Sequence, residues 1–231
     1  MLQLLFTIAV TAAGFPVAML LRLSGPRLPL RMASRYWAPL LQAGAGARIE
    51  VQGLEQVDWS RPLVLACNHQ SMFDIVALFR VVPVPLRFAL KRELAAMPLL
   101  GWYAKAMGMV FIDRDNARDA RSKLRAAVTH LRDAGAIAAF PEGTRSRDGD
   151  VRPFKGGAFQ LAIEAGVPVV PVAIVGSGAV LPATGLFRVR PGTIRLRFGT
   201  PIETTGLAPG ERRALALRAH EAVVMLKRQA G

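Results

Sequence analysis

Side chains suited to acid–base chemistry gather in one short segment, residues 68–74, which reads Asn-His-Gln-Ser-Met-Phe-Asp. The segment follows an apolar run, Leu63–Cys67, that is typical of a buried strand. His69, one of only three histidines, therefore stands at the end of a strand, and the carboxylate of Asp74 follows five positions later. A neutral imidazole is a suitable base near pH 7, and a carboxylate on its second nitrogen fixes the tautomer. The pattern predicts a general base with an orienting partner.

Two simpler interpretations of this segment remain open at this point. Ser71 and Asp74 have the spacing of a capping box, which needs no chemistry. His69 fits equally well as a buried histidine whose ring nitrogens are satisfied by neighbours. Residues five apart do not share a helix face. The catalytic interpretation therefore requires His69 in the turn before a helix and Asp74 in the first turn of that helix.

A second polar segment, residues 140–147, reads Phe-Pro-Glu-Gly-Thr-Arg-Ser-Arg and follows a predicted strand over residues 137–140. A glycine-bearing loop at the end of a strand presents backbone N–H groups, and arginines add guanidinium forks. Both are suited to binding a phosphate group. An ordinary basic surface turn is the alternative.

Composition limits the classes of partner. The 231 residues include 52% hydrophobic residues, enough for a sizeable core. Lys and Arg number 30 against 16 Asp and Glu, and a net charge of +14 attracts nucleic acid, anionic lipid surfaces or phosphorylated substrates. The single cysteine, Cys67, excludes an intrachain disulfide and favours a reducing compartment. No cysteine and histidine cluster has metal-ligand spacing, so we expect no structural metal.

The amino-terminal segment has the pattern of a membrane anchor. Residues 2–21 carry no charged side chain, although Pro16 is expected to kink a helix there. Arginines then follow with no acidic residue before Glu50, at positions 22, 27, 31, 35 and 48. An apolar segment with a basic flank predicts a helix that spans or is deeply embedded in a membrane, with its arginines at cytoplasmic headgroups. A signal peptide and a buried helix of a soluble core are the alternatives.

A second helix over residues 27–43 would complete an amino-terminal helical hairpin. The chain then alternates between strands and helices, which predicts the α/β class with a mixed, largely parallel sheet flanked by helices. The clearest helical periodicity covers residues 119–131. We therefore expect membrane-anchoring helices over residues 1–46 and a second domain over residues 47–231.

Four blocks together resemble one known family. They are Asn68–Asp74, Lys91–Leu94 with Pro98-x-x-Gly101-Trp102, Phe111–Arg114 and Pro141–Arg145, and a Val-Pro-rich run over residues 167–172 completes the pattern. In this order and spacing the blocks resemble the glycerophospholipid acyltransferase family, above all its lysophosphatidic acid acyltransferases. The resemblance covers about half of the chain, from Leu63 to Val175, and identifies residues 47–231 as an acyltransferase domain.

The resemblance implies transfer of a fatty acyl group from a thioester, acyl-CoA or acyl-ACP (acyl carrier protein), to the sn-2 hydroxyl of lysophosphatidic acid. His69 is then the general base and Asp74 its orienting partner. Arg145 is the first choice for the acceptor phosphate, and Lys91 and Arg114 are further candidates. Gly143 allows close backbone approach, Thr144 offers a hydroxyl, and the carboxylate of Glu142 is expected to position Arg145 or a nearby loop.

Other roles follow less directly. Met97, Leu100 and Trp102, with Leu99 and Tyr103, are candidates for an apolar acyl channel, although ordinary helix packing explains each equally well. The family suggests backbone N–H groups near residues 169–171 as oxyanion donors. Cys67 lies close to His69, but a cysteine in an apolar run is more often core. Direct transfer without an acyl-enzyme is therefore the simpler mechanism.

The expected partners are membrane lipid, lysophosphatidic acid and the acyl donor, with no cofactor, no metal and no nucleic acid. The expected location is the cytoplasmic face of the cell membrane. The alternatives are the same chemistry on another acceptor (glycerol phosphate, another lysophospholipid or lyso-ornithine lipid), thioester hydrolysis, or a nonenzymatic basic protein that binds membrane or nucleic acid. The last explains the charge but not the order of the blocks.

Overall fold

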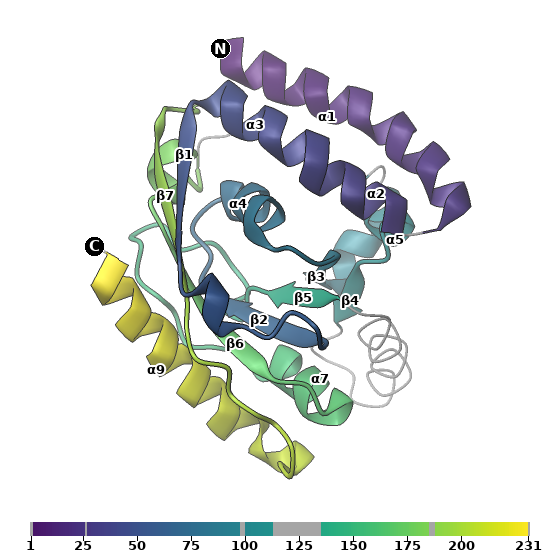
Figure 1. Cartoon of the computed structure of the whole chain (residues 1–231). Helices are drawn as coiled ribbons and strands as arrows, with labels where there is room; N and C mark the ends of the chain where they lie inside the picture. Colours follow the sequence, from purple (N-terminus) through teal and green to yellow (C-terminus); the bar gives the residue numbers. More distant parts are fainter. Residues whose placement is uncertain (1, 26, 98–99, 113–134, 185–187, 231) are drawn as a thin grey trace.

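The described part of the chain is organised around a seven-stranded β-sheet with strand order β1-β7-β6-β2-β5-β3-β4 (Figure 1). The computed structural model describes residues 2–25, 27–97, 100–112, 135–184 and 188–230. The strands are β1 (Ala47–Gln52), β2 (Leu63–Cys67), β3 (Leu86–Lys91), β4 (Val110–Ile112), β5 (Ala136–Ala139), β6 (Val169–Val175) and β7 (Gly192–Phe198).

The direction of the strands decides where a site can form. Every neighbouring pair is parallel except β6 and β7. Every residue of β2 and of β5 is buried, as expected for central strands covered on both faces. Because β6, β2, β5, β3 and β4 all run the same way, the segments that leave their carboxyl ends meet at one edge of the sheet. Crevices at such an edge are the usual binding sites of open α/β sheets.

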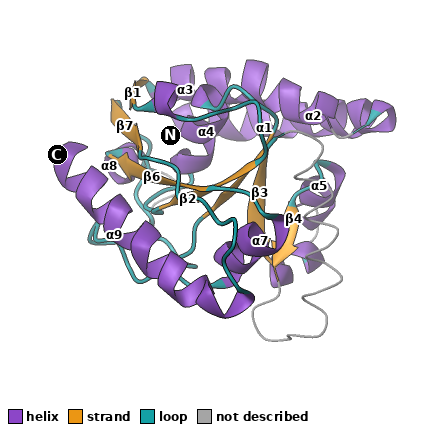
Figure 2. Ribbon diagram, turned by 60° about the horizontal axis from the view of Figure 1, so that its bottom comes forward, coloured by secondary structure: helices purple, strands orange, loops and turns teal. Residues whose placement is uncertain are grey.

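Helices cover both faces of the sheet (Figure 2). The α-helices are α1 (Leu2–Leu21), α2 (Arg27–Met32), α3 (Ala38–Ala45), α4 (Phe73–Val81), α5 (Leu100–Ala106), α7 (Gly157–Ala165), α8 (Ser177–Val180) and α9 (Arg212–Ala230). A π-helical turn, η2 (Ala33–Trp37), joins α2 to α3, and 3-10 turns occupy η1 (Arg22–Ser24), η3 (Leu54–Gln56), η4 (Arg92–Ala96) and η5 (Pro209–Glu211). α4 and the amino-terminal helices lie on one face, and α7 and α9 lie on the other.

The amino-terminal helices form a hairpin, in which α1 packs against α2, η2 and α3 (Figure 1). Trp37 Nε1 donates a hydrogen bond to Thr11 Oγ1 across the two arms, at 3.2 Å. α1 continues through Pro16, and α3 ends where Gly46 adopts a left-handed backbone, with φ of 64°. In the described residues, no helix is both long and apolar enough to cross a membrane, so the spanning form of the predicted anchor is not found there.

The strand and helix predictions agree with the structure wherever it describes them. β2 and β5 fall on the strands predicted over residues 63–67 and 137–140, and α2, η2 and α3 cover the helix predicted over residues 27–43. The predicted helix over residues 119–131 lies outside the described residues. α8 was not predicted, since its four residues, Ser-Gly-Ala-Val, are too short to show helical periodicity.

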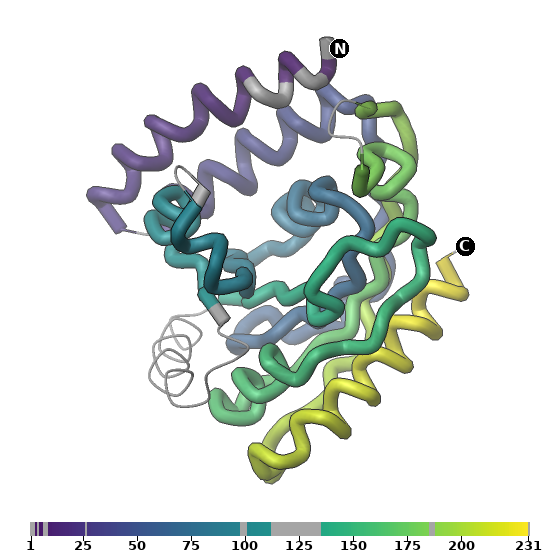
Figure 3. The backbone as a smooth tube through the Cα atoms, turned by 180° about the vertical axis from the view of Figure 1, so that it is seen from behind, coloured from purple at the N-terminus to yellow at the C-terminus, as the bar shows by residue number. Residues whose placement is uncertain are grey.

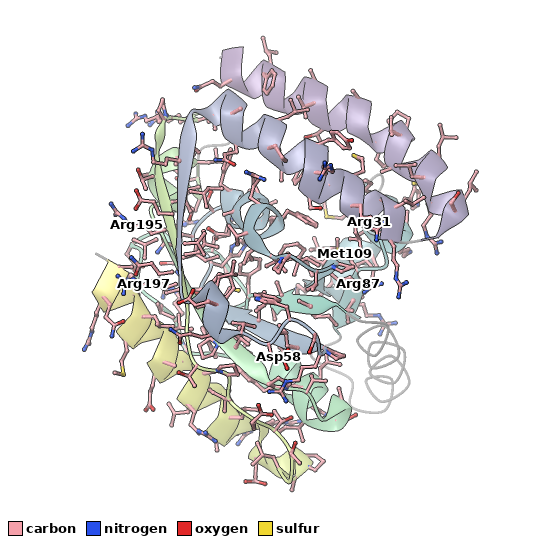
Figure 4. The ribbon with its side chains drawn as sticks, viewed as in Figure 1. Arg31, Asp58, Arg87, Met109, Arg195 and Arg197 are labelled. Carbon is pink, nitrogen blue, oxygen red and sulfur yellow. The ribbon has the colours of Figure 1, made fainter. Side chains whose placement is uncertain are left out.

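Part of the positive charge lies far from the strands that carry the candidate site. Figure 4 shows Arg195 and Arg197 on β7, on the opposite side of the molecule from Arg87 and Met109 near β3 and β4. Arg195 is paired with Glu50 on β1, with Nε and Oε2 3.0 Å apart. The net charge of the chain therefore does not by itself locate a binding site at the edge where the carboxyl ends of the parallel strands meet.

Candidate active site

His69 and Asp74 form a direct pair at the carboxyl end of β2. The Nδ1 atom of His69 lies 2.7 Å from Oδ2 of Asp74. His69 lies in the turn after β2, and Asp74 is the second residue of α4. The arrangement is the one that the five-residue spacing requires for a base and its orienting group. The Asp74 side chain is completely buried, whereas 14% of the His69 side chain is exposed.

One carboxylate oxygen does two tasks. Besides His69, Oδ2 of Asp74 accepts hydrogen bonds from the backbone N–H groups of Gln70 (2.8 Å) and Ser71 (2.9 Å). The hydroxyl of Ser71 in turn accepts from the N–H of Phe73, at 3.1 Å. The two interpretations are therefore not alternatives, because the carboxylate that binds the N–H groups of the turn before α4 also holds the imidazole.

The pairing fixes the tautomer of His69. The Oδ2 atom already accepts two backbone N–H groups, so Nδ1 must be the protonated ring nitrogen that donates to it. Nε2 then carries the lone pair of the neutral ring. Among the described residues, none hydrogen-bonds Nε2. The ring is therefore oriented with its basic nitrogen available to a substrate.

The loop after β5 supports His69 on three sides. The ring of Phe140 stacks on the imidazole, with centroids 3.9 Å apart and planes inclined by 15°. The N–H of Ser146 donates to the carbonyl of His69 at 2.8 Å. The N–H of His69 donates to Oε1 of Glu142 at 2.7 Å. Both the ring and the peptide of the base are thus held in position.

Glu142 is a buried tie between two loops. Its second oxygen, Oε2, accepts a hydrogen bond from the N–H of Arg152 at 3.0 Å, and only 3% of the residue is exposed. Burial raises the pKa of its carboxyl group, although the N–H donors of Arg152 and His69 favour the charged form. These contacts join Glu142 to His69 and Arg152 rather than to Arg145, and its expected role in positioning a nearby loop stays a prediction.

Asn68 adds a tie that the sequence interpretation did not assign. Its Oδ1 accepts from the N–H of Ile174 (2.7 Å), and its Nδ2 donates to the carbonyl of Ile174 (2.8 Å). The backbone pairing of β2 with β6 ends at Cys67 and Val172. One residue later, the side chain of Asn68 takes the place of a backbone partner for β6. The signal was available, because an amide directly after a buried strand needs a partner.

The candidate phosphate-binding loop lies at the same edge, at the end of β5. Gly143 has φ of 80°, a left-handed conformation that glycine adopts without strain. Gly143 and Thr144 are exposed, and Arg145 is half-buried. Among the described residues, the side chain of Arg145 has no ionic or hydrogen-bond partner. Within that part of the chain, no carboxylate competes with a phosphate for its guanidinium.

Lys91, the last residue of β3, ends at the same edge as His69 and Arg145. Its Nζ lies 2.7 Å from Oε1 of Glu93, and about half of its side chain is exposed. An acceptor phosphate would have to exchange with that carboxylate. Arg114 lies outside the described residues, so its predicted role stays a prediction.

The suggested oxyanion donors near residues 169–171 are wrong. The N–H of Val169 donates to the carbonyl of Ile202 at 2.9 Å, and Pro171 has no N–H to donate. Val169 and Pro171 pair with Val64 and Ala66 inside the sheet, upstream of the end that carries His69. The ladder has already used these groups.

Two of the candidates for an acyl channel lie on the surface. Met97 and Trp102 are exposed by 47% and 59%. The side chain of Leu100 and all of Leu99 lie outside the described residues. Tyr103 is half-buried against Phe15 of α1, with ring centroids 5.7 Å apart, and burial raises its pKa to about 12. A role of these residues in holding an acyl chain stays a prediction.

Cys67 is not placed to react. Its side chain is completely buried, and burial, reinforced by the nearby Asp74, raises the pKa of its thiol well above the usual value. A protonated thiol is a poor nucleophile. In the described residues, no group of three or more His, Cys, Asp or Glu side chains has the arrangement of a metal site.

Sequence comparisons agree on one family. The family model described as Acyltransferase matches residues 48–175. Human 1-acyl-sn-glycerol-3-phosphate acyltransferase alpha is 36% identical over 188 residues, which cover 80% of this chain and 65% of the human protein. The 1-acyl-sn-glycerol-3-phosphate acyltransferase of Saccharomyces cerevisiae is 31% identical over 76% of this chain and 58% of its own length. The chain thus spans less than two thirds of these relatives.

A solved structure is similar over nearly the whole chain. The crystal structure of the 1-acyl-sn-glycerophosphate (LPA) acyltransferase PlsC from Thermotoga maritima superposes with a TM-score of 0.77 and 26% sequence identity. The similarity covers 99% of this chain and 93% of that protein. It includes the mixed, largely parallel sheet with helices on both faces.

Proposed function

Because the chain belongs to the acyltransferase family, we propose that it transfers a fatty acyl group from a thioester to the sn-2 hydroxyl of lysophosphatidic acid, giving phosphatidic acid. The observation that carries the proposal is the His69–Asp74 pair, with a protonated Nδ1 and an available Nε2. The relatives named for this reaction support the choice of acceptor.

The pair suits a direct displacement. Nε2 of His69 removes the proton of the acceptor hydroxyl as its oxygen forms a bond to the thioester carbonyl carbon. The tetrahedral intermediate then collapses, the carbon–sulfur bond breaks, and the imidazolium returns the proton to the departing sulfur. Asp74 stabilises the transient positive charge on the ring. A general base of this kind contributes roughly 10²- to 10⁴-fold to a rate.

The acceptor phosphate is assigned to the open side of the site. Arg145 is the first choice because its side chain has no partner among the described residues and because it follows the strand next to that of His69. A phosphate monoester carries about −1.5 to −2 charges at neutral pH, so a second cation is useful. Lys91, at the end of the next strand, supplies it in this proposal. Gly143 lets the backbone come close to the phosphate, and Thr144 offers its hydroxyl as a hydrogen-bond donor.

A membrane location is part of the proposal, with the hairpin of α1 to α3 embedded in the surface of the cytoplasmic leaflet. Large apolar side chains are exposed along the hairpin, at Leu5, Phe6, Val17, Met19, Leu20, Leu23, Leu28, Tyr36 and Leu40. An apolar cavity of about 560 Å³ lies between its arms, and its lining includes Arg31 and Arg35. Exposed apolar surface beside arginines suits a layer of anionic headgroups above acyl chains. In this arrangement residues 1–46 anchor the catalytic domain, residues 47–231.

One experiment tests the function. The membrane-bound protein is supplied with an acyl thioester and a panel of acceptors, namely lysophosphatidic acid, glycerol 3-phosphate, a lysophospholipid without a phosphate monoester, and lyso-ornithine lipid. Thiol release and the acylated product are both measured, and the assay is repeated with His69→Ala. We expect rapid release only with lysophosphatidic acid, and a loss of roughly 10²- to 10⁴-fold in the variant.

Each other outcome has a definite meaning. Faster transfer to another acceptor would replace lysophosphatidic acid while keeping the chemistry. Equal thiol release without any acceptor would indicate a hydrolase. No release with any acceptor would contradict the enzymatic proposal and favour a nonenzymatic membrane-binding protein.

A further inference from the structure

A cavity of about 330 Å³ lies directly beside the catalytic motif, and the proposed mechanism does not use it. Its lining comes from Gln70, from the loop at residues 146–149 and from the segment at residues 176–184 that follows β6. The volume is at the lower end of the range typical of ligand pockets. We call it the β6-side cavity.

The β6-side cavity is lined by two residues that adjoin or contact His69. Gln70 follows His69 in the chain, and Ser146 donates its N–H to the carbonyl of His69 at 2.8 Å. In the sheet, β6 and β5 flank β2 on opposite sides. The segment after β6 therefore bounds the cavity on one side of His69, whereas Arg145 and Lys91 follow β5 and β3 on the other. The opposite wall of the cavity is the loop at residues 146–149, which follows Arg145 in the chain.

The lining offers acceptors for amide N–H groups. Nε2 of Gln70 donates to the carbonyl of Gly149 at 3.3 Å, which identifies the amide nitrogen and leaves Oε1 facing no donor among the described residues. The hydroxyl of Ser146 donates to Oδ1 of Asp148 at 2.7 Å, so its lone pairs remain available. Both Gln70 and Ser146 are buried, so neighbouring atoms restrict the movement of their side chains.

The lining also carries one available cation. Arg147 is exposed, and within the described residues its guanidinium has no carboxylate partner. The one acidic residue of the lining, Asp148, is already engaged by Ser146, by the N–H of Asp150 and by the side chain of Arg152. An incoming phosphate would therefore meet an unpaired guanidinium.

We propose that the β6-side cavity binds the 4′-phosphopantetheine arm of the acyl donor, with Gln70 and Ser146 at its amides and Arg147 at its phosphate. This arm carries two amides, a phosphate at one end and the thioester at the other. In this arrangement the thioester end of the arm extends past Gln70, the residue that follows His69 in the chain, to reach the base. The inference rests on the proposed acyl-transfer function. Coenzyme A and acyl carrier protein both present this arm.

The test uses a series of donors that share one acyl chain. They are acyl-CoA, acyl carrier protein loaded with the chain, S-acyl phosphopantetheine, S-acyl pantetheine, and the short thioester of N-acetylcysteamine. The full-length protein is assayed in vesicles with saturating lysophosphatidic acid. Arg147→Ala removes the cation, and Arg213→Ala is the matched control, because Arg213 is an exposed arginine on α9 outside the cavity lining.

We expect Arg147→Ala to raise KM about tenfold for the donors that carry the phosphate, with little change for S-acyl pantetheine and the short thioester. A Cβ at Gly178 would lie 3.7 Å from the side chain of Gln70, an ordinary contact. Gly178→Leu therefore narrows the cavity without backbone strain. It should raise KM for every donor that carries pantetheine, more than for the short thioester, and Gly178→Ala should have a smaller effect.

Uniform effects of Arg147→Ala and Gly178→Leu on all five donors, or no effect on any, would overturn the inference. The acyl-transfer proposal would survive that result, since it fails only if the wild-type protein transfers from none of the donors. A selective effect with acyl-CoA, with the carrier protein or with both supports the inference, and the comparison of their wild-type KM values identifies the source of the arm.

Discussion

The imidazole of His69 and the guanidinium of Arg145 follow neighbouring strands of one sheet, yet the structure holds them in opposite ways. His69 is tied through its ring nitrogen, its backbone N–H, its carbonyl and its ring face. Two of the groups that hold it, Asp74 and Glu142, are buried carboxylates. Arg145 has no side-chain partner in the described residues, and its neighbours Gly143 and Thr144 are exposed.

This difference reflects the different requirements of a general base and of a phosphate-binding cation. A base that must meet a hydroxyl at a fixed angle gains from being held in place before the substrate arrives. A cation that binds phosphate gains from having no internal anion to displace. Changes on the side of His69 should therefore lower kcat, and changes on the side of Arg145 should raise KM for the acceptor.

After the loss expected for His69→Ala, the largest effect is expected for Asp74→Asn. An asparagine oxygen in the place of Oδ2 can still accept from His69, Gln70 and Ser71. Its amide nitrogen takes the place of Oδ1, which has no hydrogen-bond partner among the described residues. The substitution therefore removes the charge and keeps the hydrogen bonds to the turn before α4. We expect kcat to fall roughly 10²- to 10³-fold with little change in KM for either substrate.

Asp74→Ala is the companion variant, because it removes the hydrogen bonds to the turn before α4 as well as the charge. Thermal unfolding should show a lower midpoint for Asp74→Ala than for Asp74→Asn, since a lost hydrogen bond costs about 1 kcal/mol. If Asp74→Asn keeps wild-type kcat, the carboxylate has only a structural role. That result would contradict the expectation that changes near His69 lower kcat whereas changes near Arg145 raise KM for the acceptor.

The next largest effect is expected for Glu142→Gln. A glutamine keeps one acceptor oxygen but turns an amide N–H₂ group toward the N–H of either His69 or Arg152. The peptide of the base is then displaced, and we expect kcat to fall about 10- to 100-fold. KM for lysophosphatidic acid should stay within about twofold, because no contact joins Glu142 to the side chain of Arg145.

Stability against pH distinguishes this effect from simple unfolding. Burial raises the pKa of Glu142 in the folded protein. A carboxyl with a raised folded pKa stabilises the fold below its unfolded pKa and loses that contribution as pH rises through the folded value. The free energy of unfolding of the wild type, relative to Glu142→Gln, should therefore decrease over that range. A parallel pH dependence in both proteins would contradict the assignment of the raised pKa.

The sequence predicts the tightly held side of the site better than the open side. The His69–Asp74 pair is local, because five residues and one turn place both groups, and an apolar run marks the preceding strand. The strands and their order along the chain follow from hydrophobic patterning. Their order within the sheet does not, and it decides that the ends of β2, β5 and β3 lie together.

Contacts between distant segments explain what the sequence missed. The carboxylate of Glu142 looked like a neighbour of Arg145, but it binds the backbone of His69, 73 positions away in the chain. Asn68 similarly binds Ile174, 106 positions away. The suggested oxyanion donors failed for a related reason: residues 169–171 lie within the sheet, where the ladder already uses the backbone groups. Spacing along the chain carries no information about such pairings.

A smaller effect, on a different kinetic constant, is expected for Arg145→Ala. Loss of one charge-assisted contact to phosphate should raise KM for lysophosphatidic acid about tenfold and leave kcat and KM for the donor nearly unchanged. Lys91→Ala should act in the same direction but less, since Lys91 is already paired with Glu93. Arg147→Ala is the matched control, because it should affect the donor and not the acceptor. A fall in kcat alone for Arg145→Ala would place this residue with the base and remove the division between the two sides of the site.

The smallest effect is expected where the carboxyl-terminal helix contacts the loop that supports Glu142. Figure 3 shows the segment after β5 passing close to the end of α9. Lys227 donates through Nζ to the carbonyl of Gly149 at 2.6 Å, and this carbonyl also accepts from Gln70. His220 donates through Nε2 to the carbonyl of Val151 at 3.2 Å, one residue before Arg152. α9 is therefore linked to His69 through the loop at residues 149–152. That loop contacts Gln70, which follows His69, and Glu142, which accepts from the N–H of His69.

Lys227→Met keeps the aliphatic stem and removes the donor, so the loop loses one of several ties. We expect kcat to fall about two- to fivefold, with both KM values unchanged, because one hydrogen bond of this kind contributes about 1 kcal/mol. Lys227→Arg should restore most of the rate, and Arg228→Met, the same change at the exposed neighbour, should have no effect. A rise in KM for the acceptor instead would mean that the loop acts on Arg145, and that the two sides of the site are mechanically joined rather than separate.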